Sequence, residues 1–258
     1  MARFKITLEY EGTRYSGWQV QKNARTVQGE LIGAFADALG SRDFELMGSG
    51  RTDAGVHALM QVAHIEARTQ LAPHILRMKV NDKLPADVNV IDIVKVDPKF
   101  HARHDATSRT YLYQISRRRT SFGKRYVWWV KDTLGADAMR AACAAFEGFH
   151  DFRSFTKDDP EEKSTTVEMQ ECSLHEFGDL IVLRIQGSHF LWKMVRQMVG
   201  IIVEAGRGAM SPAQITQMLR TSTTIPATTT APPSGLFLEH VRYKGDGPAP
   251  PVRPTFRM

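Results

Sequence analysis

The sequence predicts an α+β protein built from two similar domains. Segments in which apolar residues alternate, as in strands buried on one face, recur along the chain. Segments with apolar residues every three or four positions, as in amphipathic helices, lie between them. This strand-first order occurs in residues 1–100 and again in residues 101–258. We therefore expect an N-terminal α+β domain over 1–100 and a C-terminal one over 101–258, although no sequence repeat is visible.

The first half opens with a strand, because apolar residues alternate from Phe4 to Tyr10. Gly12 begins a loop. A helix follows from Val27, with Thr26 as its N-cap and Gly40 as its stop. The remaining expected elements are strands at 44–47, 61–67 and 88–96 and a helix at 73–83 that begins with a proline.

The second half repeats the pattern. A hairpin is expected to turn at Gly178, and a helix is expected from Asp137, as its N-cap, to Phe146. A longer helix is predicted from Phe190 to Ala205. The other expected elements are strands at 110–116, 127–130, 167–177, 180–186 and 236–243 and a helix at 212–219.

Two segments of the second half have the composition of irregular structure. Residues 221–234 contain six Thr and three Pro, which predicts a mobile or extended loop. Residues 245–258 contain four Pro and are expected to form an irregular strap or to stay loose.

Composition excludes several classes of protein. No stretch approaches the roughly 18 apolar residues of a membrane span, and the first residues lack the apolar core of a signal peptide. Cys143 and Cys172 are too few for a disulfide framework or a zinc set. We therefore expect a cytoplasmic protein that does not associate with membranes.

The basic residues are concentrated in one segment. Residues 99–125 hold eight Lys and Arg against a single acid, Asp105, although the whole chain has a formal charge of only +6. Aromatic residues are mixed into the segment. Clustered cations gain from counterion release on a polyanion, so this segment favours a nucleic-acid partner. The alternative is a solvated basic hairpin.

Familiar cofactor and metal signals are missing. Gly48-Ser49-Gly50 lacks the third glycine of a dinucleotide fingerprint, and there is no Walker loop. His101 and His104 are three residues apart but have no third ligand nearby, so we interpret them as polar residues of a loop or as polar residues that face the substrate. No metal and no cofactor are expected.

The segment from Gly48 to His57 is the strongest candidate for chemistry. It places Asp53 among three glycines and two residues after Arg51. An opposite charge favours the ionised carboxylate if the two side chains meet, and an ionised, positioned Asp is able to act as a nucleophile or base. The alternative is an Asp that caps a turn and forms a surface ion pair.

Two further clusters contain candidate substrate contacts. Arg109 and Tyr111 are two apart on an expected strand and so share one face, where a tyrosine is able to stack on a base beside an arginine on phosphate. An ordinary exposed strand face is the alternative. Arg196 lies opposite the apolar stripe of its helix, so periodicity predicts a solvated side chain unless a second domain covers it.

Taken together, these clusters resemble the tRNA pseudouridine synthase A family. The matching blocks span almost the whole chain in order: Glu9–Thr13, Gly17–Gln19, Thr26–Gln28, Gly50–His57, Phe100–Arg103, Arg109–Tyr111, Asp151–Phe155, Met194–Arg196, Val199–Gly200, Ala231–Pro232 and Gly235–Leu238. The string Arg-Thr-Asp-Ala-Gly-Val-His at residues 51–57 is the most specific of them. Departures are mild: Ser49 replaces a common alanine, and Trp192-Lys193 replaces a more usual basic or histidine pair.

The resemblance implies a fold and a reaction. The fold would be two similar α+β domains whose antiparallel sheets join across a central basic cleft. The reaction would isomerise uridine to pseudouridine in the anticodon stem-loop of tRNA, at positions 38, 39 and 40. The resemblance implies a homodimer and no cofactor.

The resemblance also implies residue roles. Asp53 matches the catalytic aspartate, and Arg51 and Arg196 match positions beside that carboxylate. Tyr111 matches a tyrosine that stacks on the target base and is a candidate general base. Leu236 matches an apolar wall of the uracil pocket. We further expect substrate contacts from Arg109, Arg25 and Arg14.

Two other functions remain open from the residues alone. A non-catalytic tRNA-binding module or chaperone would use the basic segment but would not need a carboxylate among glycines. An aspartate-dependent hydrolase would require a second acid or a metal site, and the sequence offers no sign of either.

Overall fold

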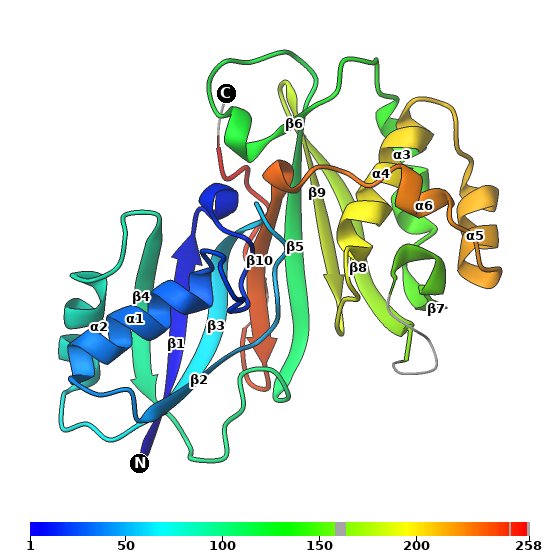
Figure 1. The fold of residues 1–258 in the computed structure, drawn as a ribbon. Coiled ribbons are helices and arrows are strands. Elements are labelled where there is room, and N and C mark those ends of the chain that lie inside the picture. The colour runs from blue at the N-terminus through cyan, green and yellow to red at the C-terminus, as the bar shows by residue number, and fades with distance from the viewer. Residues whose placement is uncertain (158–163, 248, 257–258) are drawn as a thin grey trace. The chain divides into compact units, whose positions relative to one another are not determined.

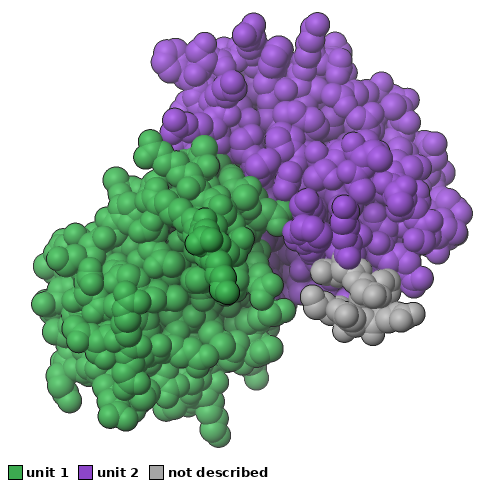
Figure 2. All heavy atoms as spheres, in the orientation of Figure 1, with its two compact units in different colours: residues 1–107, 237–247 green, residues 108–236, 248–258 purple. Residues whose placement is uncertain are grey.

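The computed structural model describes residues 1–157, 164–247 and 249–256. Contacts divide the chain into two compact units, coloured separately in Figure 2. Unit 1 comprises residues 1–107 and 237–247, and unit 2 comprises residues 108–236 and 248–258. The sequence placed the division at residue 100 with all later residues in the second domain. The contact division differs because the chain returns to unit 1 near its end.

The sheet of unit 1 is centred on β1 (Ala2–Tyr10) and β3 (His57–Ala67), which pair antiparallel. On the other side of β1, β4 (Val88–Lys95) is also antiparallel. β3 pairs antiparallel with β2 (Phe44–Gly48) and, at its first residues, parallel with β10 (Leu236–Tyr243). The pairing of β10 with β3 explains why residues 237–247 belong to unit 1.

Two helices pack together on one face of this sheet, α1 (Val27–Leu39) and α2 (Pro73–Asn81) (Figure 1). The predicted ends of α1 are confirmed. The Thr26 hydroxyl accepts from the Gly29 N–H at 3.3 Å, and Gly40 takes the left-handed conformation that ends the helix. The expected loop at Gly12 begins with a short 3-10 turn, η1 (Gly12–Arg14).

The sheet of unit 2 consists mainly of antiparallel strands. β5 (Ala106–Ser116) pairs with β9 (Leu180–Gly187), β9 with β8 (Thr166–Phe177), and β8 with β7 (Gly148–Asp151). The expected turn of the β8–β9 hairpin is confirmed, since Gly178 has a φ of 61°. A short parallel strand, β6 (Trp128–Trp129), joins the end of β5. The predicted α+β class is therefore confirmed.

The helices of unit 2 correct two predicted starts. α3 (Ala136–Ala144) is preceded by Gly135, so Asp137 is not its N-cap but lies in its first turn, 3.0 Å from Arg140. α4 (Met194–Gly206) begins four residues later than predicted, because Lys193 has a φ of 60°, which a right-handed helix does not allow. α5 (Pro212–Arg220) begins with the capping box of Ser211.

Residues 221–234 are not an extended loop as predicted. They contain a short helix, α6 (Ile225–Thr228), and a 3-10 turn, η4 (Pro233–Gly235). Pro226 and Ala231 are buried. The threonines that predicted an extended segment instead hold the chain locally, since three of their hydroxyls donate to carbonyls three or four residues earlier in this segment.

The C-terminal strap follows the predicted irregular course where it is described. Gln114 Oε1 accepts from the Thr255 N–H at 2.6 Å, and Arg184 Nη1 donates to the Pro250 carbonyl at 2.9 Å. Residues 248, 257 and 258 of this predicted strap lie outside the described residues. No helix among the described residues has the length and apolar character needed to cross a membrane.

Candidate active site

Asp53 lies on a tight turn in the loop that joins β2 to β3. The Val56 N–H donates to the Asp53 carbonyl at 3.2 Å, and Gly55 has a φ of 78°. The side chain of Asp53 is half-buried, whereas that of Arg51 is exposed. The hydrogen bond across the turn holds the backbone at Asp53. The side chain that carries the carboxylate therefore extends from a fixed point of the chain.

Thr52, the residue before Asp53, is held on two sides. Its hydroxyl lies 2.8 Å from the Tyr10 hydroxyl, and its carbonyl accepts from the Trp18 N–H at 3.1 Å. Burial raises the pKa of Tyr10 to about 12, so this phenol stays protonated near neutral pH. Gly17 makes the close approach possible: its φ is 91°, and a Cβ there would lie 2.5 Å from the Thr52 carbonyl oxygen.

His57 closes the other end of the turn. Its buried ring stacks on Phe237 with centroids 4.7 Å apart, and its Nδ1 accepts from the Gly12 N–H at 2.9 Å. An accepting Nδ1 in a neutral imidazole leaves the proton on Nε2. His57 therefore joins three separate segments of unit 1, and the Asp53 turn starts and ends on anchored residues.

A polar cluster holds the loop that packs on this turn. The Tyr15 hydroxyl donates to Asp87 at 2.5 Å, and the Gly55 N–H donates to the Tyr15 carbonyl at 3.2 Å. Arg25 stacks over the Tyr15 ring at 4.7 Å and donates through Nε to Glu30 at 2.5 Å. Arg25, a predicted substrate contact, thus has a carboxylate partner within its own unit.

In unit 2, Arg109 and Tyr111 contact one segment between β9 and α4. The Tyr111 ring meets Phe190 edge-on at 5.1 Å and 89°. Arg109 Nη1 donates to the Ser188 carbonyl at 3.0 Å. Both side chains are half-buried. Their spacing of two on β5 brings them to neighbouring partners, as the strand period predicts.

Arg196 is not the solvated side chain that helical periodicity predicts. It is half-buried, and its Nε donates to the Ala231 carbonyl at 2.7 Å. The Ala231 N–H donates in turn to the Arg196 carbonyl at 3.0 Å. Residues 221–234 of the same unit therefore contribute to the cover of this side chain. Leu236, at the start of β10, is buried.

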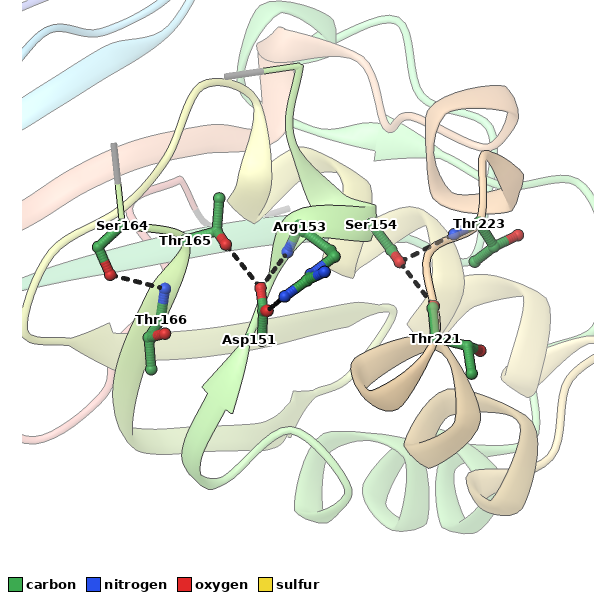
Figure 3. A network of polar contacts seen from close by, with 8 residues as sticks. All are labelled: Asp151, Arg153, Ser154, Ser164, Thr165, Thr166, Thr221 and Thr223. Carbon is green, nitrogen blue, oxygen red and sulfur yellow. Dashed lines mark hydrogen bonds and ion pairs between the residues drawn. The ribbon is translucent and has the colours of Figure 1, made fainter. Parts of the chain in front are cut away.

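A polar network anchors the start of this covering segment (Figure 3). The Ser154 hydroxyl donates to the Thr221 carbonyl and accepts from the Thr223 N–H, both at 3.1 Å. Asp151 accepts from the Arg153 side chain and from Thr165, and although burial opposes it, these bonds lower the pKa of Asp151. The Asp151–Phe155 block thus supports residues 221–234, which reach Arg196.

His101 and His104 behave as loop residues, as interpreted from the sequence. Their rings lie 4.2 Å apart, and His101 Nδ1 accepts from the Arg103 N–H at 3.2 Å and the His104 N–H at 3.3 Å. The His101 N–H donates to Asp105 at 2.8 Å. Within residues 1–157, 164–247 and 249–256, no three His, Cys, Asp or Glu side chains are grouped so that they could bind a metal ion.

The arginines at the end of β5 differ in their partners. Arg117 forms an ion pair with Glu176, and Arg118 forms one with Asp179 at 2.9 Å, both at the tip of the β8–β9 hairpin. Arg119 instead lies over the Trp129 ring at 5.8 Å. The charge of residues 99–125 favoured a nucleic-acid partner for the segment as a whole, whereas two of these three arginines face carboxylates.

The predicted site residues divide evenly between the units. Unit 1 contains Arg14, Arg25, Arg51 and Asp53. Unit 2 contains Arg109, Tyr111, Arg196 and Leu236. Arg14 is exposed on η1. The meeting of the two groups around one substrate stays a prediction.

The sequence assigned no role to Tyr10, Gly17 or Trp18. All three lie within the blocks that resemble the family, so the signal was present as motif membership. Their contact with Thr52 depends on how the loop after β1 folds back on the β2–β3 loop, which residue spacing does not reveal.

Comparison with known proteins identifies the family. A family model described as "tRNA pseudouridine synthase" matches residues 6–105 and 142–244. A "tRNA pseudouridine synthase A" of Exiguobacterium sp. is 39% identical over 246 residues, which cover 95% of this chain and 99% of that protein. One from Myxococcus xanthus is 39% identical over 251 residues, covering 96% and 94%. A "tRNA pseudouridine synthase A 2" of Bacillus anthracis is 33% identical and is covered completely.

The matches cover nearly the whole chain, so this α+β protein is an isomerase that acts on tRNA. The chain belongs to the tRNA pseudouridine synthase family.

Proposed function

We propose that this protein isomerises uridine to pseudouridine in the anticodon stem-loop of tRNA, at positions 38, 39 and 40, with Asp53 as the catalytic carboxylate. The observation that carries the proposal is the clamping of the Asp53 turn by Tyr10, Trp18 and His57. Similarity to the relatives over nearly the whole chain supports the reaction and the substrate class.

The reaction demands a fixed carboxylate. The bond between uracil N1 and ribose C1′ breaks, the base turns, and a bond forms between C5 and C1′. The hydrogen on C5 leaves to solvent and N1 takes up a proton, so atoms balance within an isomerisation. The Asp53 carboxylate serves by attack on C1′, by addition to the uracil ring, or by removal of a sugar proton. Each route requires it to touch the flipped nucleotide.

The other predicted residues would hold that nucleotide. Tyr111 would stack on the base, and Leu236 would form an apolar wall of its pocket. Arg51 and Arg196 would flank the carboxylate. A base in a stem leaves its stack at a cost of a few kcal/mol, which contacts from Arg14, Arg25 and Arg109 would help to offset.

The resemblance further leads us to propose that the protein is a homodimer, binds tRNA in the cytoplasm and needs no metal or organic cofactor. Size-exclusion chromatography with light scattering tests the dimer. Activity after exhaustive chelation tests the independence from metals.

Release of tritium from tRNA that contains 5-tritiated uridine tests the role of Asp53. We expect Asp53→Asn and Asp53→Ala to abolish release while tRNA binding stays close to that of the wild type. Asp43→Asn, at an exposed acid outside the site, is the matched control and should turn over normally. Full turnover by Asp53→Asn would end the assignment.

The same experiment separates the enzyme from a non-catalytic tRNA-binding module. A binding module would retain tRNA but release no tritium even as the wild type. The anchored Asp53 turn favours the enzyme, because a simple polyanion binder has no use for a fixed carboxylate.

A further inference from the structure

Phe122 is the most exposed large apolar side chain among the described residues. Its exposed fraction is 81%, and it lies between β5 and β6 in residues 117–126, which we call the basic loop. Single exposed apolar residues are common and need no explanation by themselves. The setting of Phe122 differs, because the chain around it is held in place and carries cations.

The basic loop is fixed on both sides of Phe122. Thr120 Oγ1 accepts from the Phe122 N–H at 3.1 Å and donates to the Phe122 carbonyl at 2.8 Å. Gly123 has a φ of 68°, and a Cβ there would lie 2.1 Å from the Phe256 ring. The exposed phenyl ring therefore projects from an ordered turn buttressed by the C-terminal strap.

The end of the basic loop is anchored to the sheet. Gln114 Nε2 donates to the Tyr126 carbonyl at 2.8 Å, while its Oε1 accepts from the Thr255 N–H. The next residues enter β6, which pairs with the last residues of β5. An aromatic residue whose backbone is already fixed has less conformational entropy to lose when a ligand stacks on it.

The charged residues of the basic loop itself are all positive. Residues 117–126 contain five Lys and Arg and no acid. Arg117 and Arg118 face Glu176 and Asp179, but Arg119 lies over Trp129, whose exposed fraction is 40%, and Lys124 is exposed. Arg119 and Phe122 are three residues apart, so at most about 10 Å of chain separates them, a span of roughly three stacked nucleotides.

We propose that the basic loop is a second RNA-binding surface, in which Phe122 stacks on an unpaired nucleobase of the tRNA and Arg119 and Lys124 hold the adjacent phosphates. Stacking on an aromatic ring within a positively charged surface is the general mode of binding to single-stranded nucleic acid. The inference rests on the proposed function for the identity of the RNA, but it uses none of the residues assigned to the catalytic site. Positive charge favours this polyanion over a second copy of a chain that itself carries +6.

Unit 2 offers a matched control in Phe149. Its exposed fraction is 73%, close to that of Phe122, and it lies on β7. It pairs in register with Glu168 and is two residues from Asp151. Carboxylates repel phosphate, so an RNA-binding role is not expected at Phe149 despite its similar exposure.

The first test measures the affinity of the full-length protein for unmodified tRNA. We expect Phe122→Leu to weaken binding about tenfold, because leucine is apolar but cannot stack as an aromatic ring does. Phe122→Trp, which keeps an aromatic ring at this position, should bind tRNA with about the affinity of the wild type. Phe149→Leu should also leave the affinity unchanged. The rate of tritium release at saturating tRNA should be the same in all of these variants. Equal affinities of Phe122→Leu and the wild type, or equal losses in Phe149→Leu, would overturn the proposal.

The second test does not depend on turnover. With p-benzoylphenylalanine in place of Phe122, irradiation in the presence of tRNA should yield a protein–RNA crosslink that is absent when the probe replaces Phe149. A crosslink to a second protein chain instead of RNA would overturn the proposal. Wild-type tritium release, measured in parallel, separates the two hypotheses: a crosslink without release would contradict only the proposed function, and release without a crosslink would contradict only the second surface.

Discussion

The hydroxyl groups of Tyr10 and Thr52 lie 2.8 Å apart in the buried interior of unit 1. This hydrogen bond joins the last residue of β1 to the residue that precedes Asp53. It spans 42 residues of sequence, so it depends on the tertiary fold rather than on the turn itself. The position of the candidate catalytic carboxylate is therefore linked to the centre of the sheet.

Tyr10→Phe should lower the rate of tritium release at saturating tRNA with little change in tRNA affinity. Loss of the hydroxyl leaves the Thr52 hydroxyl with one partner fewer in a buried site, at a cost of about 1–3 kcal/mol in unfolding free energy. Tyr243→Phe is the matched control, since that buried hydroxyl bonds the Ala102 carbonyl at 2.7 Å. Urea unfolding should show that the two variants lose similar amounts of unfolding free energy, whereas only Tyr10→Phe should lose isomerase activity. Equal activities would contradict a positioning role.

Gly17→Ala should be more harmful than Gly40→Ala. Both glycines have positive φ, 91° and 65°, so both substitutions introduce backbone strain of about 1 kcal/mol. Only at Gly17 would the new methyl group also meet the Thr52 carbonyl, while at Gly40 the space is empty. We expect Gly17→Ala to lose isomerase activity in protein that still folds by circular dichroism. Comparable activity in the two variants would show that the approach of Gly17 to Thr52 is not needed.

Acid should destabilise the protein through His64. Burial, with positive charge from His101 and Arg3, lowers the pKa of His64 from 6.5 to about 4. Its Nδ1 accepts from the Ala102 N–H at 3.2 Å, a bond that a protonated ring cannot accept. The unfolded state therefore binds more protons between pH 6.5 and 4, and stability falls as pH falls through that window, by up to about 1.4 kcal/mol per pH unit.

His64→Asn checks this pH dependence. The Asn amide oxygen is an acceptor that does not titrate, so urea unfolding of the variant should lose less stability between pH 6.5 and 4 than the wild type does. Stability curves that run parallel over this window would contradict the titration of His64.

The salt dependence of tRNA binding should distinguish the basic-loop cations that contact phosphate from those that are paired with carboxylates. Replacing Arg119 and Lys124 with Gln should flatten the slope of log K against log salt by about 0.7–0.9 for each phosphate that the protein no longer neutralises. Replacing Arg117 and Arg118 should change it less, because Glu176 and Asp179 already neutralise them. A larger effect from the second pair would show that the ion pairs open to bind RNA.

Local signals made much of the fold predictable. Thr26 and Gly40 act through the adjacent backbone, so they predicted α1 almost to the residue. Long-range contacts were not predictable in the same way. Helical periodicity predicted a solvated Arg196 because it considers one helix alone. It could not include the contact with Ala231, which lies 35 residues later in the chain. Composition likewise missed how Ser154 anchors the segment that carries Ala231.

The candidate site was found by motif rather than by geometry. Asp53 stood out because it lies among three glycines, two residues after Arg51, and because residues 51–57 resemble the family. The Tyr10 and His57 contacts that hold the turn connect residues 42 and 45 positions apart, which spacing in the sequence cannot relate.

Pseudouridine-specific chemical labelling of a tRNA transcript tests the central claim most directly. After incubation with the wild type, the account predicts labelled sites at positions 38, 39 or 40, wherever the transcript carries uridine there, and none after incubation with Asp53→Asn. Label at those positions with Asp53→Asn, or label with the wild type only elsewhere in the tRNA, would contradict it.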